Sequence, residues 1–121
     1  MGFTVGEHSA FHLRRILRLF LKRWGLPELT DPAELALTEL VANVVRHVPG
    51  RHCTTLILKQ PDGLRVEISD NVPMELRPVH DADPLAESGR GLLLVDAVTD
   101  RWGSLEHREG KVVWFECDAK P

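Results

Sequence analysis

Polar side chains recur at helical spacing in an otherwise apolar segment of the first half of the chain. Glu39 and Asn43 lie one turn apart, and Arg46 and His47 fall on the same side at about 100° per residue. The adjoining side is aliphatic and is the side that a core would cover. A carboxylate and a carboxamide at the edge of a buried face can share a ligand, and hard oxygen atoms suit a divalent metal that carries a phosphate. This pairing favours a site over a plain surface carboxylate at position 39.

Two later segments carry related chemistry. Asp70 ends a strand-like run that begins at Leu64, and Gly89-Arg90-Gly91 opens an apolar helix-like run. Backbone N–H groups at a helix N-terminus can hold phosphate, and Arg90 can add a cation there. Simpler interpretations remain for each of these residues, because an Asp at a strand end often forms a turn, a Gly pair can mark only a helix start, and Arg90 can point to solvent.

The order of these features resembles the nucleotide-binding site of the ATPase superfamily of gyrases, heat-shock chaperones and histidine kinases. The small size and the sequence Glu39-Leu40-Val41-Ala42-Asn43, with His47 after it, are most similar to the anti-sigma-factor serine kinases. The resemblance extends over most of the chain, from about residue 11 to residue 116.

The resemblance implies that the protein binds ATP with Mg²⁺. Phosphoryl transfer needs a metal to offset charge and a base to orient the nucleophile. By resemblance, Glu39 is the catalytic base and Asn43 the metal ligand, and Asp70 accepts a hydrogen bond from the adenine amino group. The other implied nucleotide contacts are His47, Gly89, Arg90 and Gly91. Position 47 also suits a histidine favoured by the dipole of a helix C-terminus, and Arg46 is interpreted as a solvated residue.

The same resemblance implies the partners. They are a small antagonist protein that is phosphorylated on a serine, and a sigma factor that is held when the antagonist is phosphorylated. A homodimer is compatible with this interpretation. A net charge of −3 gives no electrostatic argument for direct nucleic-acid binding. We expect a cytoplasmic protein, since no apolar run approaches the length of a membrane span and no signal peptide is evident.

A non-catalytic switch module of the same fold is the alternative function. The family has glycines two and four residues after the adenine-binding Asp, and this chain has Val72 and Met74 there. The segment Asp70-Asn71-Val72-Pro73 therefore favours weak or lost nucleotide binding, whereas Glu39 and Asn43 favour the enzyme. A histidine-kinase catalytic fragment is a third, less favoured class, because no helix with a phosphoacceptor histidine precedes the domain.

The 121 residues predict one domain, residues 1–121, with an α+β fold. We expect helices over about 9–24, ended by Gly25, and from a cap at Asp31, with Pro32 and Glu34 supporting that start, to about Val48. Strands are predicted at 53–60, 64–70, 102–108 and 111–118, a long loop at 71–88 and a third helix over 89–99. Tight turns within the strand pairs predict a mostly antiparallel sheet with helices on one face, a two-layer sandwich.

Two further sequence features bear on surface and core. The first predicted helix is basic, with Arg14, Arg15, Arg18, Lys22 and Arg23. A solvated helix face is the preferred interpretation, and a contact surface for an acidic protein is the alternative. Cys53 and Cys117 lie in strand-like runs without metal-binding spacing, so we expect free buried thiols.

Overall fold

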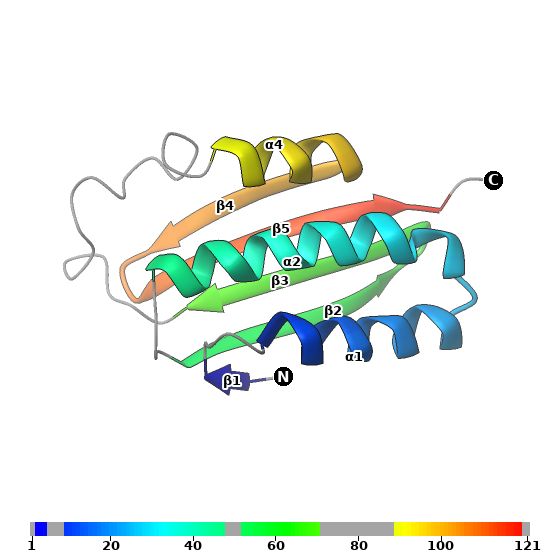
Figure 1. Cartoon of the computed structure of the whole chain (residues 1–121), viewed down its shortest axis with the longest axis horizontal. Coiled ribbons are helices and arrows are strands. Elements are labelled where there is room, and N and C mark those ends of the chain that lie inside the picture. The colour runs from blue at the N-terminus through cyan, green and yellow to red at the C-terminus, as the bar shows by residue number, and fades with distance from the viewer. Residues whose placement is uncertain (1, 5–8, 48–51, 71–88, 120–121) are drawn as a thin grey trace.

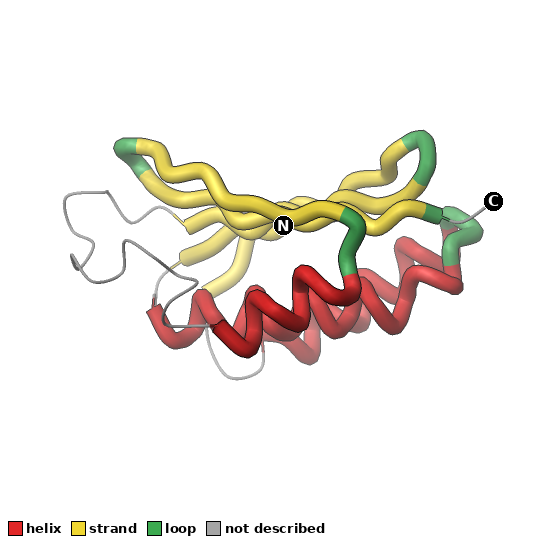
Figure 2. The backbone as a smooth tube through the Cα atoms, turned by 90° about the horizontal axis from the view of Figure 1, so that it is seen from above, coloured by secondary structure: helices red, strands yellow, loops and turns green. Residues whose placement is uncertain are grey.

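Three α-helices cover one face of a five-stranded sheet in the part of the chain that the computed structural model describes, residues 2–4, 9–47, 52–70 and 89–119 (Figures 1 and 2). The helices are α1 (Ser9–Arg23), α2 (Thr30–His47) and α4 (Gly89–Val98), with a short 3₁₀ helix η1 (Pro27–Leu29) between the first two. The strands are β1 (Gly2–Thr4), β2 (His52–Gln60), β3 (Gly63–Asp70), β4 (Arg101–His107) and β5 (Gly110–Asp118). The predicted two-layer α+β sandwich is confirmed.

The strand order is β1-β2-β3-β5-β4, and every neighbouring pair is antiparallel. The hairpins β2–β3 and β4–β5 match the predicted strand pairs within one residue at each end. β5 lies between β3 and β4, so the second hairpin joins the first through its later strand. Strand β1 was not predicted, because three residues are too few for an alternating pattern to show.

The core lies between the sheet and the helices. On β3 and β5 the alternating residues Leu64, Val66, Ile68, Val113, Phe115 and Cys117 are buried, and they pair across the strands in the register Leu64↔Cys117, Val66↔Phe115 and Ile68↔Val113. Successive side chains of a strand point to opposite faces, so one face of each strand reaches the helices and the other does not. Leu13, Leu17 and Leu21 of α1 and the aliphatic side of α2 complete this core.

Gly25 ends α1 as predicted, in a left-handed conformation with φ +73°. The N–H of Gly25 bonds to the Lys22 carbonyl oxygen at 3.2 Å, and the N–H of Leu26 bonds to the Leu21 carbonyl oxygen at 2.8 Å. This pair of bonds is a Schellman motif, which satisfies the last carbonyl groups of the helix.

The predicted start of α2 is wrong by two residues, because a cap at Asp31 makes Pro32 the first helical residue. The helix begins at Thr30, directly after η1, so Asp31 is not its cap. Glu34 does not complete a capping box but forms an ion pair with Arg18 at 2.6 Å. The approach of η1 already supplies helical backbone before Asp31, and a side-chain cap is not required there. The predicted end near Val48 lies outside the described residues, since α2 ends at His47.

Helix α2 lies in the middle of the helical layer and contacts both α1 and α4 (Figure 1). Two hydrogen bonds join it to α1, from Arg14 Nη1 to Thr38 Oγ1 at 3.0 Å and from Arg18 Nε to Glu34 Oε1 at 2.7 Å. Helix α4 is joined to β4 by the indole N–H of Trp102, which donates to Asp96 Oδ1 at 3.0 Å.

Both cysteines are free and buried, as expected. Burial raises the pKa of the Cys53 thiol to about 11 and that of Cys117 to about 12, with smaller contributions from nearby carboxylates. None of the described helices is both long and apolar enough to cross a membrane.

Candidate functional site

The three elements that carry the predicted site residues meet at one end of the molecule. The carboxyl ends of α2 and β3 and the amino end of α4 all lie on the left in Figure 1, and Figure 2 shows the same end from above. These elements are separated by long stretches of sequence. The fold therefore collects the helix with Glu39 and Asn43, the strand that ends in Asp70, and the glycines of α4 into one region.

Glu39 and Asn43 lie on the side of α2 that is turned away from α1. Glu34 marks the α1 side, because it pairs with Arg18. Asn43 is nine residues further on, which at about 100° per residue is half a turn around the helix, and Glu39 lies about 140° from Glu34. Since α4 packs on the other side of α2 from α1, both side chains lie on the flank toward α4 (Figure 1).

Glu39 and Asn43 differ in how deeply their side chains are buried. Asn43 is only 9 % exposed, while Glu39 is half-buried. Asn43 and Thr55 are the buried polar side chains of the described residues, in a core that otherwise consists of aliphatic side chains, Phe115 and two thiols. Asn is mostly an exposed residue in folded proteins, so a buried Asn43 distinguishes this face of α2 from its aliphatic neighbours. The predicted edge position of the pair agrees with both exposures.

Asp70 lies on the helical face of the sheet, at the end of the buried row Leu64, Val66 and Ile68. The alternation along β3 puts position 70 on the same face as position 68, and the register pairs it with Lys111 of β5. The backbone N–H of Lys111 donates to Asp70 Oδ1 at 3.2 Å. A carboxylate has about four acceptor positions, so this contact orients the group and is compatible with a further donor.

Helix α4 begins at Gly89, as predicted, and Gly89, Arg90 and Gly91 form its first turn. The N–H groups of a first turn have no partner within the helix, which is the property that lets a helix N-terminus hold phosphate. The side chains of Arg90, Arg46 and His47, and the predicted loop 71–88 with Val72, Pro73 and Met74, lie outside the described residues.

Comparison with protein families assigns the fold. The model of the histidine kinase-like ATPase domain matches residues 7–117. The chain belongs to this family. No curated protein matches the chain significantly.

Histidine kinase-like ATPase domains bind ATP, generally with Mg²⁺. The residues present are chemically suited to both. Asn43 brings a carboxamide oxygen, which is a hard ligand of the kind Mg²⁺ accepts alongside waters and phosphates. Asp70 brings an acceptor of the kind that selects an amino-bearing base edge, and the α4 N-terminus brings N–H donors and a positive dipole. The described residues contain no group of three or more His, Cys, Asp or Glu side chains placed to hold a metal ion.

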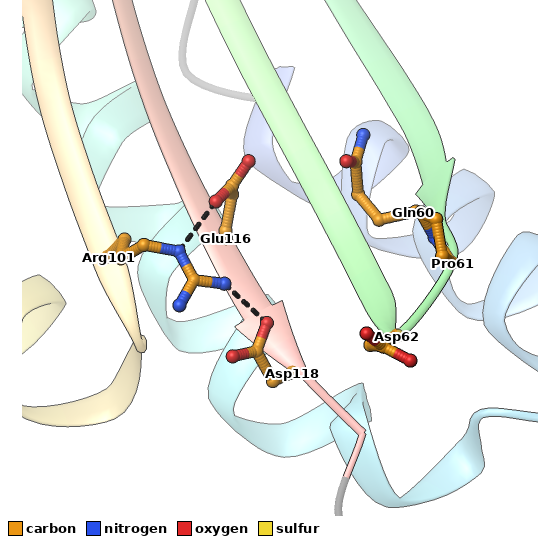
Figure 3. A pocket seen from close by; sticks show the side chains of 6 residues that line it. All are labelled: Gln60, Pro61, Asp62, Arg101, Glu116 and Asp118. Carbon is orange, nitrogen blue, oxygen red and sulfur yellow. Dashed lines mark hydrogen bonds and ion pairs between the residues drawn. The ribbon is translucent and has the colours of Figure 1, made fainter.

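A separate pocket of about 320 Å³ lies at the opposite end of the sheet, beside the β2–β3 turn (Figure 3). Arg101 donates there to Glu116 from Nε at 2.7 Å and to Asp118 from Nη2, and Asp62 faces them across the pocket. The paired carboxylates raise the pKa of Arg101. Arg101 is therefore already paired with two carboxylates, and this pocket lies at the opposite end of the sheet from the predicted site residues.

Sequence reasoning missed the contacts that position the site elements. Arg14 and Thr38 are 24 residues apart, and no local pattern indicates that they meet. Asp96 and Trp102 are only six residues apart, but they lie on a helix and on the following strand, and their hydrogen bond depends on how α4 packs. Both contacts fix helices rather than touch a ligand.

Proposed function

We propose that this histidine kinase-like ATPase domain is a regulatory protein serine/threonine kinase of the anti-sigma-factor type. It binds ATP and Mg²⁺, phosphorylates a serine of an antagonist protein, and controls a sigma factor through that phosphorylation. The observation that carries the proposal is Asn43, a buried carboxamide on an apolar helix face, at the end of the fold where β3 ends and α4 begins.

Each site residue has one role in this proposal. Asn43 would hold the Mg²⁺ that accompanies the phosphates, and Asp70 would accept a hydrogen bond from the adenine amino group. Gly89 and Gly91 present backbone N–H groups to phosphate oxygens, with Arg90 and His47 as further contacts on the phosphate side. The half-buried position of Glu39, one turn before Asn43, suits a base that must reach both the bound nucleotide and an incoming protein.

The transfer step needs one nucleophile and one base. The serine Oγ attacks the γ-phosphorus, the bond between that phosphorus and the β–γ bridging oxygen breaks, and ADP leaves with the electron pair. The serine proton passes to the Glu39 carboxylate. The metal supplies charge neutralisation on the phosphates when it is bound.

A switch module without catalysis is the second candidate function. The observation that favours it is the sequence Asp70-Asn71-Val72-Pro73, which lacks the glycines that let the backbone approach the base and ribose in the family. In that case the fold and the partner surfaces are retained, and nucleotide affinity is weak or absent.

A calorimetric titration with ATP and ADP, with and without Mg²⁺, tests binding. We expect saturable binding that Mg²⁺ strengthens, and Asn43→Ala should weaken the Mg²⁺-dependent part by about 1–3 kcal/mol, as for contacts to charged groups. Gln60→Ala is the matched control, because it removes an amide at the opposite end of the sheet. Absence of binding at millimolar nucleotide would replace the kinase by the switch module.

Phosphate transfer tests catalysis separately. Glu39→Gln should leave nucleotide affinity nearly unchanged, because Glu39 does not hold the adenine, and should slow transfer to a serine-bearing partner from the native host by about 10²–10⁴-fold. Glu28→Gln, an exposed carboxylate in η1, is the control with the same change of charge. Wild-type transfer by Glu39→Gln would mean that Glu39 is a structural carboxylate only.

A further inference from the structure

Helix α1 lies at the edge of the helical layer, so only part of its surface is covered (Figure 1). One side packs on the sheet through Leu13, Leu17 and Leu21, which are at most 2 % exposed. A second side meets α2 through Arg14 and Arg18. The remaining surface is here named the α1 outer face, and it comprises Arg15, Ile16, Leu19, Phe20, Lys22 and Arg23.

The α1 outer face combines a hollow with an exposed leucine. Ile16, Leu19, Phe20, Lys22 and Arg23 line a surface pocket of about 570 Å³. Leu19 is 69 % exposed, the largest exposure among the large hydrophobic side chains of the described residues. A hollow with an aliphatic and aromatic floor can take an inserted apolar side chain, and exposed apolar patches of this kind commonly mark interaction sites.

Two cations, Lys22 and Arg23, line this hollow, and Arg15 lies on the same face with its guanidinium carbon 6.0 Å from the centroid of the Phe11 ring. The segment Ser9–Arg23 contains five of the chain's 15 Lys and Arg residues and no Asp or Glu, although the whole chain has a net charge of −3. Arg14 and Arg18 are occupied by Thr38 and Glu34 of α2. Arg15, Lys22 and Arg23 are exposed, and within the described part of the chain they make no ion pair. The positive charge is therefore local, and it is available to a ligand.

We propose that the α1 outer face is a docking surface for an acidic amphipathic helix of a partner protein. An apolar side chain of that helix enters the hollow beside Leu19 and Phe20, and its flanking carboxylates pair with Arg15, Lys22 and Arg23. The apolar centre supplies most of the affinity, and the charges supply orientation and rate of association. The proposal does not rest on nucleotide binding, because α1 carries none of the proposed nucleotide contacts.

Charge and shape favour an acidic helix as the ligand of this face over a second copy of the chain and over an anionic membrane. A symmetric contact between two copies through α1 would bring two sets of cations together, which repel each other. An anionic membrane would attract the cations, but a flat lipid surface does not fill a hollow, whereas a protruding side chain does. An acidic amphipathic helix satisfies both the charge and the shape.

The test uses the full chain and a synthetic amphipathic peptide of about 18 residues, with leucines repeating at three- and four-residue spacing and glutamates beside them. Titration calorimetry should show saturable binding that weakens as salt rises. Leu19→Ser and the pair Lys22→Glu with Arg23→Glu should each weaken binding about tenfold. The matched controls are Leu105→Ser and the pair Lys59→Glu with Arg108→Glu, also exposed, which should change binding less than twofold.

Three results would overturn the proposal. The first is equal binding of a peptide with lysine in place of each glutamate, or equal effects of the α1 and control variants. The second is the absence of saturable peptide binding together with binding to vesicles that contain phosphatidylserine. The third is a concentration-dependent dimer of the wild type that Leu19→Ser dissociates, because the face would then be a contact between copies. Circular dichroism of each variant verifies that it is folded.

Discussion

The two faces of the sheet are built from the same strands but are stabilised by different interactions. Inward positions of β3 and β5 are apolar and nearly inaccessible, and the row on β3 ends in Asp70. Outward positions of the same strands carry charges. Arg65 bonds to Glu67 at 2.7 Å and to Glu116 at 3.0 Å, and its guanidinium carbon lies 4.3 Å from the centroid of the Trp114 ring.

The two faces therefore differ in how much each contributes to the stability of the fold. Burying an apolar side chain completely stabilises the fold by about 1.5–3 kcal/mol, and a cavity adds to the loss when it is removed. Ion pairs between partly exposed groups contribute about 0–1 kcal/mol each. The helical face therefore holds the fold together and places the site residues, while the outward face of the sheet tolerates substitution.

The largest expected effect contrasts two neighbours on β5. Phe115 is fully buried, and Phe115→Ala should lower the free energy of unfolding by about 3–5 kcal/mol. Trp114 is half-buried on the outward face, and Trp114→Ala should cost less than half as much, although the side chain is larger. Urea denaturation of both variants measures the difference. Equal losses would show that the outward face is also covered in solution.

The second contrast lies within β3 and concerns function. Asp70→Asn should weaken ATP binding by about 1–3 kcal/mol and relax the preference for adenine over guanine, because guanine has a carbonyl where adenine has an amino group. Glu67→Gln, on the opposite face of the strand, should change neither. Competition between ATP and GTP measures the preference. Equal wild-type affinity for the two nucleotides would contradict the role proposed for Asp70.

The smallest effect concerns acid stability and Glu116. Hydrogen bonds from Arg101 and then Arg65 lower the pKa of Glu116 from its usual 4.5. The stabilisation is therefore fully present above pH 4.5 and is lost as pH falls through the lowered value. Glu116→Gln should be less stable than wild type near neutral pH, and the gap should close in acid. Unfolding curves across pH measure it, with Glu106→Gln as the exposed control. A gap that persists below the lowered pKa would argue against the ion-pair origin.

Local sequence signals predicted most of the fold. Alternation of Leu64, Val66 and Ile68 with polar residues identified β3 and its buried face, and Gly25 identified the end of α1. The order of strands could not be obtained in this way, because pairing of β3 with β5 joins segments separated by the third helix. The prediction put the start of α2 too late along the chain. The reason is η1 in the connection between α1 and α2, which continues helical backbone up to Thr30.

The candidate site was predictable in its residue types but not in its assembly. The spacing of Glu39 and Asn43 placed both at the edge of a buried face, and their exposures agree. The contact between Arg18 and Glu34, which are 16 residues apart, shows which side of α2 faces α1 and therefore that this edge faces α4. The orientation of Asp70 depends on the register with Lys111, 41 residues further on. Non-local contacts of this kind leave no periodic trace in a sequence.

The hydrogen bond between Trp102 and Asp96 gives the molecule an optical reporter. Indole emission depends on the polarity and hydrogen bonding of its surroundings. The Trp102 indole is hydrogen-bonded to Asp96 of α4, the helix that begins with Gly89 and Gly91. The other two tryptophans lie elsewhere, with Trp24 stacked on Phe20 and Trp114 beneath Arg65. Replacing both by phenylalanine leaves Trp102 as a single fluorophore, whose emission follows any movement of α4 when a nucleotide binds.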